Sequence, residues 1–295
     1  MVDATVGHGG HSYLFGKKLG PEGTILGLDV DEKSIQRAQL VLKDLACRVI
    51  LAHANFADVD RQVLKYGIDK VDFLLADLGV CSAQLADAER GLSFQQDMPL
   101  DMRFDQSRKT TAADIINKAD EKNLADLIYK YGEDRASRRI ARFIVRHRRD
   151  EPIKTTGQLA DIVCRALGGK RRGRIHPATR TFQALRIAVN NELENLQALL
   201  TKAPALLAAG GYVAVISFHS LEDRLVKNDF RQNAKNGVYE IVTKKPLVPC
   251  REEVKANPRA RSAKLRIARK AKGAAFREKP QNAKCEEELK KEFQP

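Results

Sequence analysis

The sequence predicts an α/β protein in which a mostly parallel sheet is interrupted by an all-helical subdomain. Short apolar strands alternate with helical segments up to about residue 103. From there to about residue 168 only helical periodicity is found, and an apolar strand pattern returns at 212–218. We therefore expect a sheet domain from 1–103 and 176–270, a helical insertion at 104–175 that binds RNA, and a charged, disordered tail at 271–295.

The expected elements follow from local patterns. Strands are expected at 1–5, 24–28, 48–52 and 71–76, the last being a run that is apolar apart from Asp72 and typical of a strand buried on both faces. One long helix is expected from 179 to 207. It should end at Gly210-Gly211, just before the strand at 212–218.

Composition limits the class of protein and its partners. The net charge of +14 favours a polyanionic partner, with simple solubility as the alternative. No apolar run approaches the roughly 20 residues that span a bilayer, so nucleic acid is favoured over a membrane. The five cysteines are scattered, without metal-ligand spacing, and predict neither disulfides nor a metal site. We expect a cytoplasmic protein and leave a homodimer open.

Polar and glycine-rich segments follow the expected strands. Because ligands bind at the carboxyl ends of strands in open α/β sheets, these segments should meet at one edge. The turn at 7–11 is followed about 20 residues later by Asp29, the layout of a nucleotide-type cofactor site in which the acid accepts hydrogen bonds from ribose hydroxyls. The five segments are 7–11, Asp29, 55–56, 77–82 and 217–220.

Seven ordered motifs resemble the ribosomal RNA small subunit methyltransferase H family, over nearly the whole chain to about residue 270. The resemblance implies a Rossmann-like, S-adenosyl-L-methionine-dependent methyltransferase. Its implied substrate is the N4 amine of a cytidine in the decoding region of 16S ribosomal RNA, and its partner is that RNA or the small ribosomal subunit. The motifs are DATVGHGGHS (3–12), DLGVCSAQL (77–85), RGLSF (90–94), PLDMR (99–103), HPATRTFQALR (176–186), SFHSLEDR (217–224) and NPRARSAKLR (257–266).

The resemblance also implies roles for individual residues. Asp29 would bind the ribose, Phe56 would lie near the adenine, and Asp77 would be an anion close to the sulfonium. The ring of His11 could contact the cofactor or only order the turn. The implied cofactor-binding residues are Gly9, Gly10, His11, Asp29, Phe56, Asp77 and Gln84.

The reacting amine and the RNA need further residues. Asp77, with the backbone carbonyls of 78–80, is the candidate acceptor for the amine hydrogens and the candidate catalytic residue. Phe218, His219 and Ser220 could line the base pocket, although Phe218 could equally be a core residue. Consecutive charges at Arg171, Arg172 and Arg174, with an arginine-rich helix before them, favour a phosphate-binding surface over a merely solvated face.

Departures from the family pattern leave other functions open. Met1 opens the first strand, where the family pattern has a leading segment before that strand, and we expect weaker cofactor binding. Met98 replaces the usual glycine and would be strained if its φ were positive. The alternatives are a methyltransferase acting on another RNA or on a protein, and a non-catalytic RNA-binding protein.

Overall fold

The computed structural model describes residues 1–81, 84–85, 87, 89–169 and 176–273. Its centre is a seven-stranded sheet in the order β3-β2-β1-β4-β5-β7-β6. All neighbouring pairs from β3 to β5 are parallel, and β7 is antiparallel to both of its neighbours. The strands are β1 (Val2–Asp3), β2 (Thr24–Asp29), β3 (Arg48–His53), β4 (Val71–Asp77), β5 (Leu207–Ser217), β6 (Tyr239–Ile241) and β7 (Lys264–Lys270).

β1 to β4 confirm the strands predicted from the sequence to within two residues at their ends, and β5 confirms the strand expected at 212–218 but begins five residues earlier, at Leu207. Val2 pairs with Leu26 on one side and with Leu74 on the other, which places β1 at the middle of the parallel part. The strand order from β3 to β5 is that of doubly wound nucleotide-binding sheets. The expected α/β class with a mostly parallel sheet is therefore confirmed.

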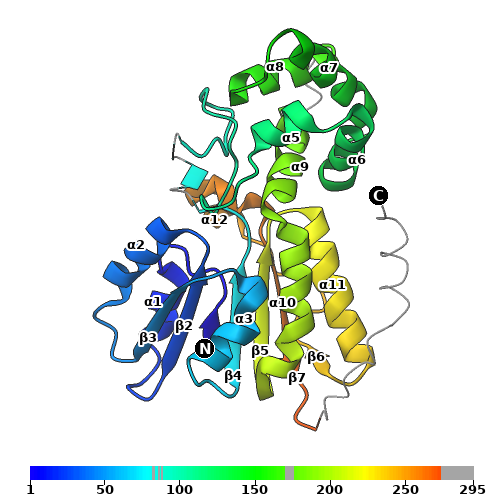
Figure 1. The fold of residues 1–295 in the computed structure, drawn as a ribbon. Coiled ribbons are helices and arrows are strands. Elements are labelled where there is room, and N and C mark those ends of the chain that lie inside the picture. Colours follow the sequence, from blue (N-terminus) through cyan, green and yellow to red (C-terminus); the bar gives the residue numbers. More distant parts are fainter. Residues whose placement is uncertain (82–83, 86, 88, 170–175, 274–295) are drawn as a thin grey trace, which may run out of the picture.

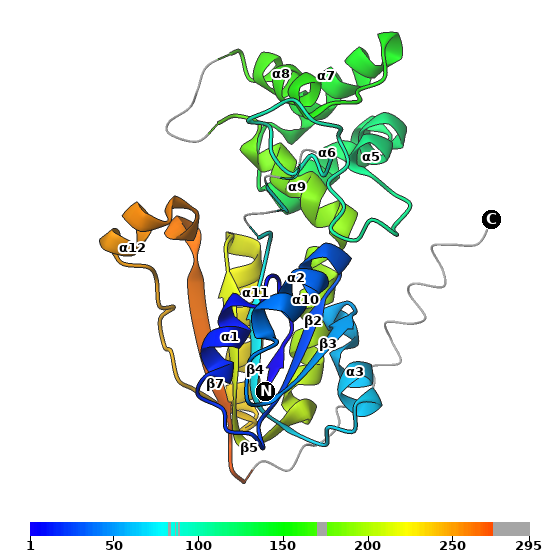
Figure 2. The same cartoon turned by 90° about the vertical axis from the view of Figure 1, so that its left-hand side faces the viewer.

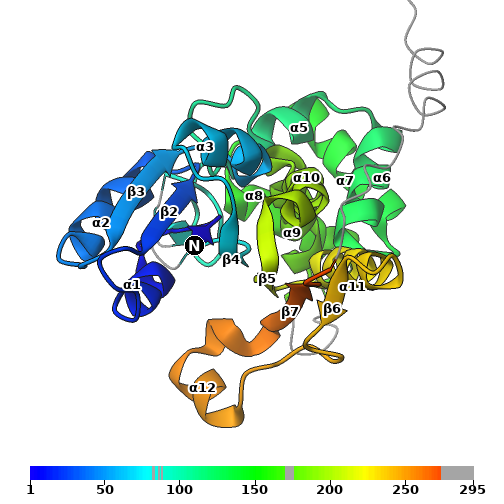
Figure 3. The same cartoon turned by 90° about the horizontal axis from the view of Figure 1, so that it is seen from below.

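Helices cover both faces of the sheet. α3, α10 and α11 pack beside one another on one face, whereas α1 and α2 lie on the other (Figure 3). An apolar core lies between the sheet and the layer formed by α3, α10 and α11, and it includes Leu26, Leu74, Leu199 and Val213. The helices are α1 (Gly10–Gly16), α2 (Glu32–Leu42), α3 (Val59–Lys65), α10 (Glu192–Leu206) and α11 (Ser220–Lys235).

A helical subdomain with its own core lies beyond the carboxyl ends of the strands (Figures 1 and 2). Capping boxes at Thr111 and Thr155 start two of its helices. The core of this subdomain also includes side chains of α9, while the boundary expected at residue 176 remains a prediction. The helices are α5 (Ala112–Lys118), α6 (Glu121–Gly132), α7 (Ser137–Asp150), α8 (Thr156–Ala166) and α9 (Thr179–Asn190).

The prediction of a single helix from 179 to 207 was wrong. The chain forms α9 and α10 with a break at Asn191, whose φ of 53° is in the left-handed region that asparagine tolerates. The side chain of Asn190 fixes the break, since it accepts a hydrogen bond from the Phe104 N–H at 2.8 Å and donates one to the Met102 carbonyl at 2.8 Å. The break lets α9 join the helical subdomain and α10 join the sheet.

A smaller expectation also fails. Gly210 does not end a helix but lies inside β5 with a φ of 80°, where the pairing with β4 is irregular. Met98 is not strained, since its φ is not positive and its N–H donates to the Thr156 hydroxyl at 3.0 Å.

A short helix, α12 (Arg251–Ala256), lies away from the sheet before β7 (Figure 2). Within the described residues, no helix is both long and apolar enough to cross a bilayer.

Candidate active site

A cavity of about 520 Å³ lies where the strands end below the helical subdomain. All five segments that the sequence analysis expected at one sheet edge contribute to its wall, which confirms their convergence. Residues at the junction of α9 and α10 and after residue 103 close the cavity from the other side. The polar and aromatic residues of the wall include His11, Asp29, Phe56, Asp77, Gln84, Phe104, Arg108, Asn190, Glu192, Asn195, Phe218 and Glu222.

Asp29 ends β2 and fixes the turn after β1. Its two carboxylate oxygens accept hydrogen bonds from the backbone N–H groups of Gly7 and Asp31, each at 2.9 Å. Burial raises the pKa of Asp29 to about 6, although these two hydrogen bonds oppose the shift. Each oxygen has a second lone pair, so the carboxylate can also accept from the hydroxyls of a ribose in the cavity.

Gly9 and Gly10 lie at the start of α1. Gly10 lines the cavity and a Cβ there would meet no atom within 4 Å, so the backbone is open to a ligand. Gly9 caps the helix with a φ of 86°, a conformation that suits glycine, and does not line the cavity. Gly9 therefore shapes the turn, whereas Gly10 exposes it.

Asp77 ends β4 and faces the turn from the neighbouring strand. Its Oδ2 lies 3.4 Å from Nε2 of His11, and its backbone N–H donates to the Thr5 hydroxyl at 2.7 Å. Its Oδ1 is buried and has no hydrogen-bond partner among the described residues. Because a buried acceptor without a partner is costly, this atom suits a ligand that brings a hydrogen-bond donor or a positive charge. The hydrogen bond with Asp77 raises the pKa of His11.

Gln84 links the segment after β4 to the end of β2. Its Oε1 accepts from the Cys81 N–H at 3.0 Å, and its Nε2 donates to Asp31 at 3.3 Å. Asp31 also receives a 2.7 Å ion pair from Arg90, whose side chain is almost fully buried. Gln84 thus belongs to a buried polar network that holds the cavity wall in place.

Two aromatic rings lie in the cavity wall at separate strand ends. Phe56 follows β3, where Asn55 caps a short 3₁₀ helix, η1 (Phe56–Asp58), by accepting from the Ala57 N–H at 2.8 Å. Phe218 follows β5, and a Cβ on Gly79 would lie 3.7 Å from its ring. β1 and β4 lie between β3 and β5 in the sheet, so the two rings flank the ends of these central strands. An aromatic ring at either place can stack on a planar ligand.

The sequence analysis missed several residues of the cavity wall. They lie around the start of α10 and form what we call the second half of the cavity, which is lined by Arg108, Glu192, Asn195, Phe218 and Glu222. Glu192, at the start of α10, is 8% exposed and lines the wall together with Asn195 and Arg108. Arg186 of α9 donates to both carboxylate oxygens of Glu192, at 2.8 and 2.9 Å. The only sequence signal was the pair of asparagines before Glu192 inside an otherwise apolar helical pattern.

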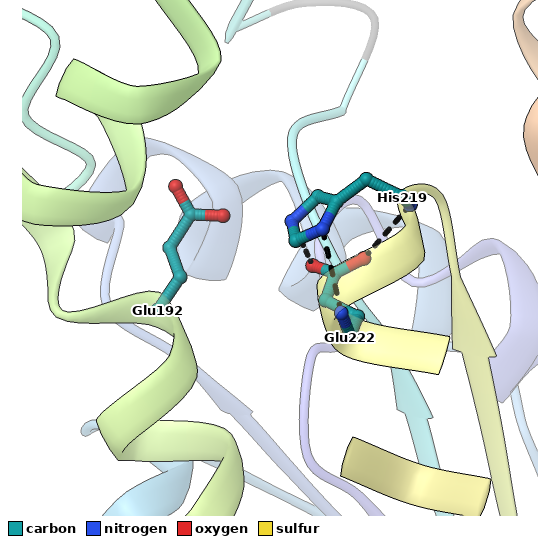
Figure 4. A group of neighbouring side chains, drawn as sticks. All are labelled: Glu192, His219 and Glu222. Carbon is teal, nitrogen blue, oxygen red and sulfur yellow. Dashed lines mark hydrogen bonds and ion pairs between the residues drawn. The ribbon is translucent and has the colours of Figure 1, made fainter. Parts of the chain in front are cut away.

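His219 and Ser220 were expected in the base pocket, but neither is among the cavity-lining residues. Nδ1 of His219 accepts from the Glu222 N–H at 3.4 Å, which caps α11, and its Nε2 lies 3.2 Å from Glu222 Oε1 (Figure 4). The Ser220 hydroxyl donates to Glu133 of the helical subdomain. The pattern S-F-H-S-L-E places Glu222 three residues after His219, a capping-box spacing that could have revealed this role.

The group formed by Glu192, His219 and Glu222 has ligand atoms within 4.8 Å of one another, as a metal site requires (Figure 4). Its carboxylates already have strong partners. Glu192 accepts from Arg186, and Glu222 Oε2 accepts from the backbone N–H groups of Phe218 and His219 at 2.9 and 3.3 Å. Because a guanidinium already neutralises Glu192, the group is better suited to hydrogen bonding than to holding a cation.

Positive charge is concentrated on α7 of the helical subdomain. Arg138 and Arg142 pair with acids of α6, at 2.6 and 3.7 Å. Arg139, Arg146 and Arg149 are exposed and form no ion pair among the described residues. The three arginines predicted at 171, 172 and 174 lie outside the described residues.

The sheet order, the acid that ends β2 and the half-buried carboxylate that ends β4 at the same cavity define a nucleotide-cofactor enzyme. A family model described as the MraW methylase family matches residues 1–271, and the chain belongs to this family.

Relatives of high identity cover most of the chain. The ribosomal RNA small subunit methyltransferase H of Cyanothece sp. is 51% identical over 269 residues, which are 91% of this chain and 87% of that protein. The protein of the same name from Sorangium cellulosum is 49% identical over 92% of this chain and 85% of that protein. A solved structure of a putative rRNA-methylase from Clostridium thermocellum matches with a TM-score of 0.43 and 16% identity, covering 91% of this chain and 87% of that one.

Proposed function

We propose that this chain transfers a methyl group from S-adenosyl-L-methionine to the N4 amine of a cytidine in the decoding region of small-subunit ribosomal RNA. The observation that carries the proposal is Asp77, which lines the cavity together with Asp29 and Glu192 and whose buried Oδ1 has no hydrogen-bond partner in the part of the chain that the structure describes. Membership of the methylase family and the name shared by the relatives support the same activity.

The part of the cavity that is lined by Gly10, His11, Asp29 and Phe56, the cofactor half, fits S-adenosyl-L-methionine. Gly9, Gly10 and His11 would form the turn that receives it, Asp29 would bind the ribose hydroxyls, and Phe56 would face the adenine. Gln84 would hold the wall beside the reacting end. When bound, S-adenosyl-L-methionine supplies a methyl group that a positively charged sulfur activates.

The chain must make a poor nucleophile reactive. The lone pair of N4 is delocalised into the cytosine ring, so acceptors on the two amine hydrogens favour the rehybridised nitrogen. Asp77, the proposed catalytic residue, would accept one of these hydrogens through Oδ1 and take up the proton that the amine loses. His11 and Thr5 hold Asp77 in place through the contacts described above.

The target base would occupy the second half of the cavity. Phe218 offers a ring for stacking, and the cytidine would be splayed out of the RNA to reach it. His219 and Ser220 remain proposed substrate-binding residues. In the ligand-free structure His219 caps α11, and the Ser220 hydroxyl donates to Glu133 of the helical subdomain.

The RNA partner would bind across the helical subdomain. The exposed arginines of α7 would contact phosphates, and we propose the same for Arg171, Arg172 and Arg174. The enzyme would act in the cytoplasm, on free ribosomal RNA or on the small subunit. A homodimer remains a prediction from the sequence.

A transfer assay tests this function. The protein is incubated with methyl-labelled S-adenosyl-L-methionine and small ribosomal subunits lacking the modification, and the product is split between nuclease and protease treatment. We expect the label in nuclease-sensitive material. Label in a ribosomal protein would identify a protein methyltransferase, and cofactor binding without any transfer would favour a non-catalytic RNA-binding protein.

A further inference from the structure

Glu192 occupies a special position between the two parts of the chain. It begins α10 directly after the break at Asn191 and lines the cavity, and its carboxylate lies across from His219 and Glu222 at the start of α11 (Figure 4). Arg186 of α9 holds both carboxylate oxygens. The side chain is therefore fixed by an ion pair that crosses the break, so it is ordered before a substrate arrives.

The ion pair leaves hydrogen-bonding capacity on Glu192. A carboxylate has about four acceptor sites, and Arg186 uses two of them. Glu222, which also lines the cavity, is different, because Oε2 accepts from two backbone N–H groups and Oε1 faces the His219 ring at 3.2 Å. Asp105 lines the cavity too, but it is only partly buried and its Oδ1 already accepts from the N–H and the hydroxyl of Ser107. Glu192 is therefore the buried and fixed acid of this part of the cavity that can accept a hydrogen bond from a base.

The chemistry of nucleobases decides which base such an acceptor selects. The 4-position of cytosine carries an amine that donates two hydrogens, whereas the 4-position of uracil carries a carbonyl that only accepts. A fixed carboxylate attracts the first and repels the second. The same contact would give the N4 amine a second acceptor beside Asp77.

We infer that Glu192, held by Arg186, is the specificity-determining residue that selects cytidine over uridine by accepting a hydrogen bond from the exocyclic amine. The inference rests on the proposed function and names a residue outside the motifs that predicted it. Carboxylates pair with the cytosine amine in direct base readout, where a good contact discriminates by roughly tenfold or more.

The test measures base preference without turnover. Dissociation constants for cytidine 5′-monophosphate and uridine 5′-monophosphate are determined by NMR titration of the full chain saturated with S-adenosylhomocysteine. The unmodified protein should prefer the cytidine nucleotide about tenfold or more. Glu192→Gln can turn either a donor or an acceptor toward the base, so its preference should fall to within about threefold of unity. Cofactor affinity should stay unchanged.

Glu194→Gln is the matched control, because Glu194 is exposed on the same helix and its carboxylate accepts a hydrogen bond from the Tyr131 hydroxyl at 2.9 Å. It should retain the full preference. Glu192→Asp keeps the charge but withdraws the acceptor by one methylene, so it should show an intermediate preference for the cytidine nucleotide. If Glu192→Gln does not fold, the preference of Glu192→Asp tests the role of Glu192.

The outcomes separate the inference from the function on which it rests. An unchanged cytidine preference in folded Glu192→Gln, or in Glu192→Asp if only that variant folds, overturns the role of Glu192 and leaves the methyltransferase intact. An unmodified protein that binds both nucleotides equally overturns the cytidine assignment itself, and the role of Glu192 with it.

Discussion

Nε2 of His11 lies 3.4 Å from Oδ2 of Asp77, a contact that joins the turn after β1 to the end of β4. The contact engages one oxygen of the carboxylate and leaves the other, the buried Oδ1, without a partner among the described residues. His11 thus orients Asp77, and the pair explains why two motifs far apart in the sequence belong to one site.

Replacing Asp77 by asparagine should impair the chemical step. Asp77→Asn keeps the shape but removes the charge and the proton-accepting oxygen, so kcat should fall by about 100-fold or more, as loss of a general base does. RNA affinity should be nearly unchanged. Single-turnover methylation and RNA titration measure the two effects, and Asp72→Asn, an exposed acid on the same strand, is the control. Normal single-turnover rates in Asp77→Asn would refute the catalytic role.

Cofactor affinity should depend on the ionisation of Asp29. Burial raises its pKa to about 6, so the ligand-free protein takes up a proton as the pH falls through this value. Ribose hydroxyls prefer the carboxylate, so S-adenosyl-L-methionine should bind more weakly as the pH drops from 7 to 5, and binding near pH 6 should release protons. Calorimetry in two buffers of different ionisation enthalpy measures both effects.

Variants separate Asp29 from the other titrating group. Asp29→Asn should weaken binding at pH 7.5 by about 1.5–3 kcal/mol and flatten the pH dependence. His11, whose pKa is also raised, is tested by His11→Gln. A pH profile that survives Asp29→Asn but disappears in His11→Gln would assign the proton to the histidine instead.

The same shift has a consequence for stability. Because the folded pKa of Asp29 lies above its unfolded value of 3.8, its contribution to the free energy of unfolding is fully present below pH 3.8. That contribution is lost as the pH rises through about 6. Asp29→Asn should therefore stabilise the ligand-free protein more at pH 8 than at pH 5, which denaturant titrations at the two pH values measure. Equal changes at both would contradict the raised pKa.

Gly91 should tolerate no side chain. Its φ is 57°, and a Cβ would lie 2.0 Å from the carbonyl oxygen of Pro99. Gly91→Ala should lower the free energy of unfolding by about 3 kcal/mol or more, since both a left-handed conformation and a backbone clash are imposed. Gly20→Ala is the control, because a Cβ there meets no atom within 4 Å. Equal melting temperatures for the two variants would contradict the close approach of Gly91 to the Pro99 carbonyl.

The arginines of α7 should supply sequence-independent RNA affinity. Replacing Arg139, Arg146 and Arg149 by alanine should weaken binding and flatten the slope of log affinity against log salt by up to about 0.7 for each lost contact with a single strand. The matched control replaces Lys43, Arg61 and Lys65, which are exposed at the end of α2 and on α3, helices of the sheet domain that lie away from α7 (Figure 1). If both triple variants lose the same slope, net charge and not the α7 surface explains the binding.

Positions fixed by the ends of parallel strands could be predicted from the sequence. Asp29 and Asp77 end mainly apolar runs whose short length favours strands, and the carboxyl ends of parallel strands meet at one edge whatever the intervening lengths. Strand ends alone therefore indicate the cofactor half of the cavity.

The second half could not be predicted in this way, because it depends on a break that local periodicity conceals. The apolar stripe continues through Asn191, so the pattern predicts one helix and gives Glu192 no special position on it. The ion pair with Arg186 exists only because α9 and α10 diverge there. His219 shows the converse difficulty, since its motif predicts a substrate contact while its spacing to Glu222 also matches the helix cap that the structure contains.

The most direct test of the proposed activity is nucleoside mass spectrometry of small-subunit ribosomal RNA after incubation of the subunit with this protein and isotopically labelled S-adenosyl-L-methionine. Chromatographic retention distinguishes a methyl group on N4 of cytidine from one on C5, and fragmentation distinguishes either from one on the ribose. We expect labelled N4-methylcytidine at one decoding-region position, formed by the unmodified protein and nearly absent with Asp77→Asn. A label on C5, on the ribose or on a different base would contradict the proposed activity.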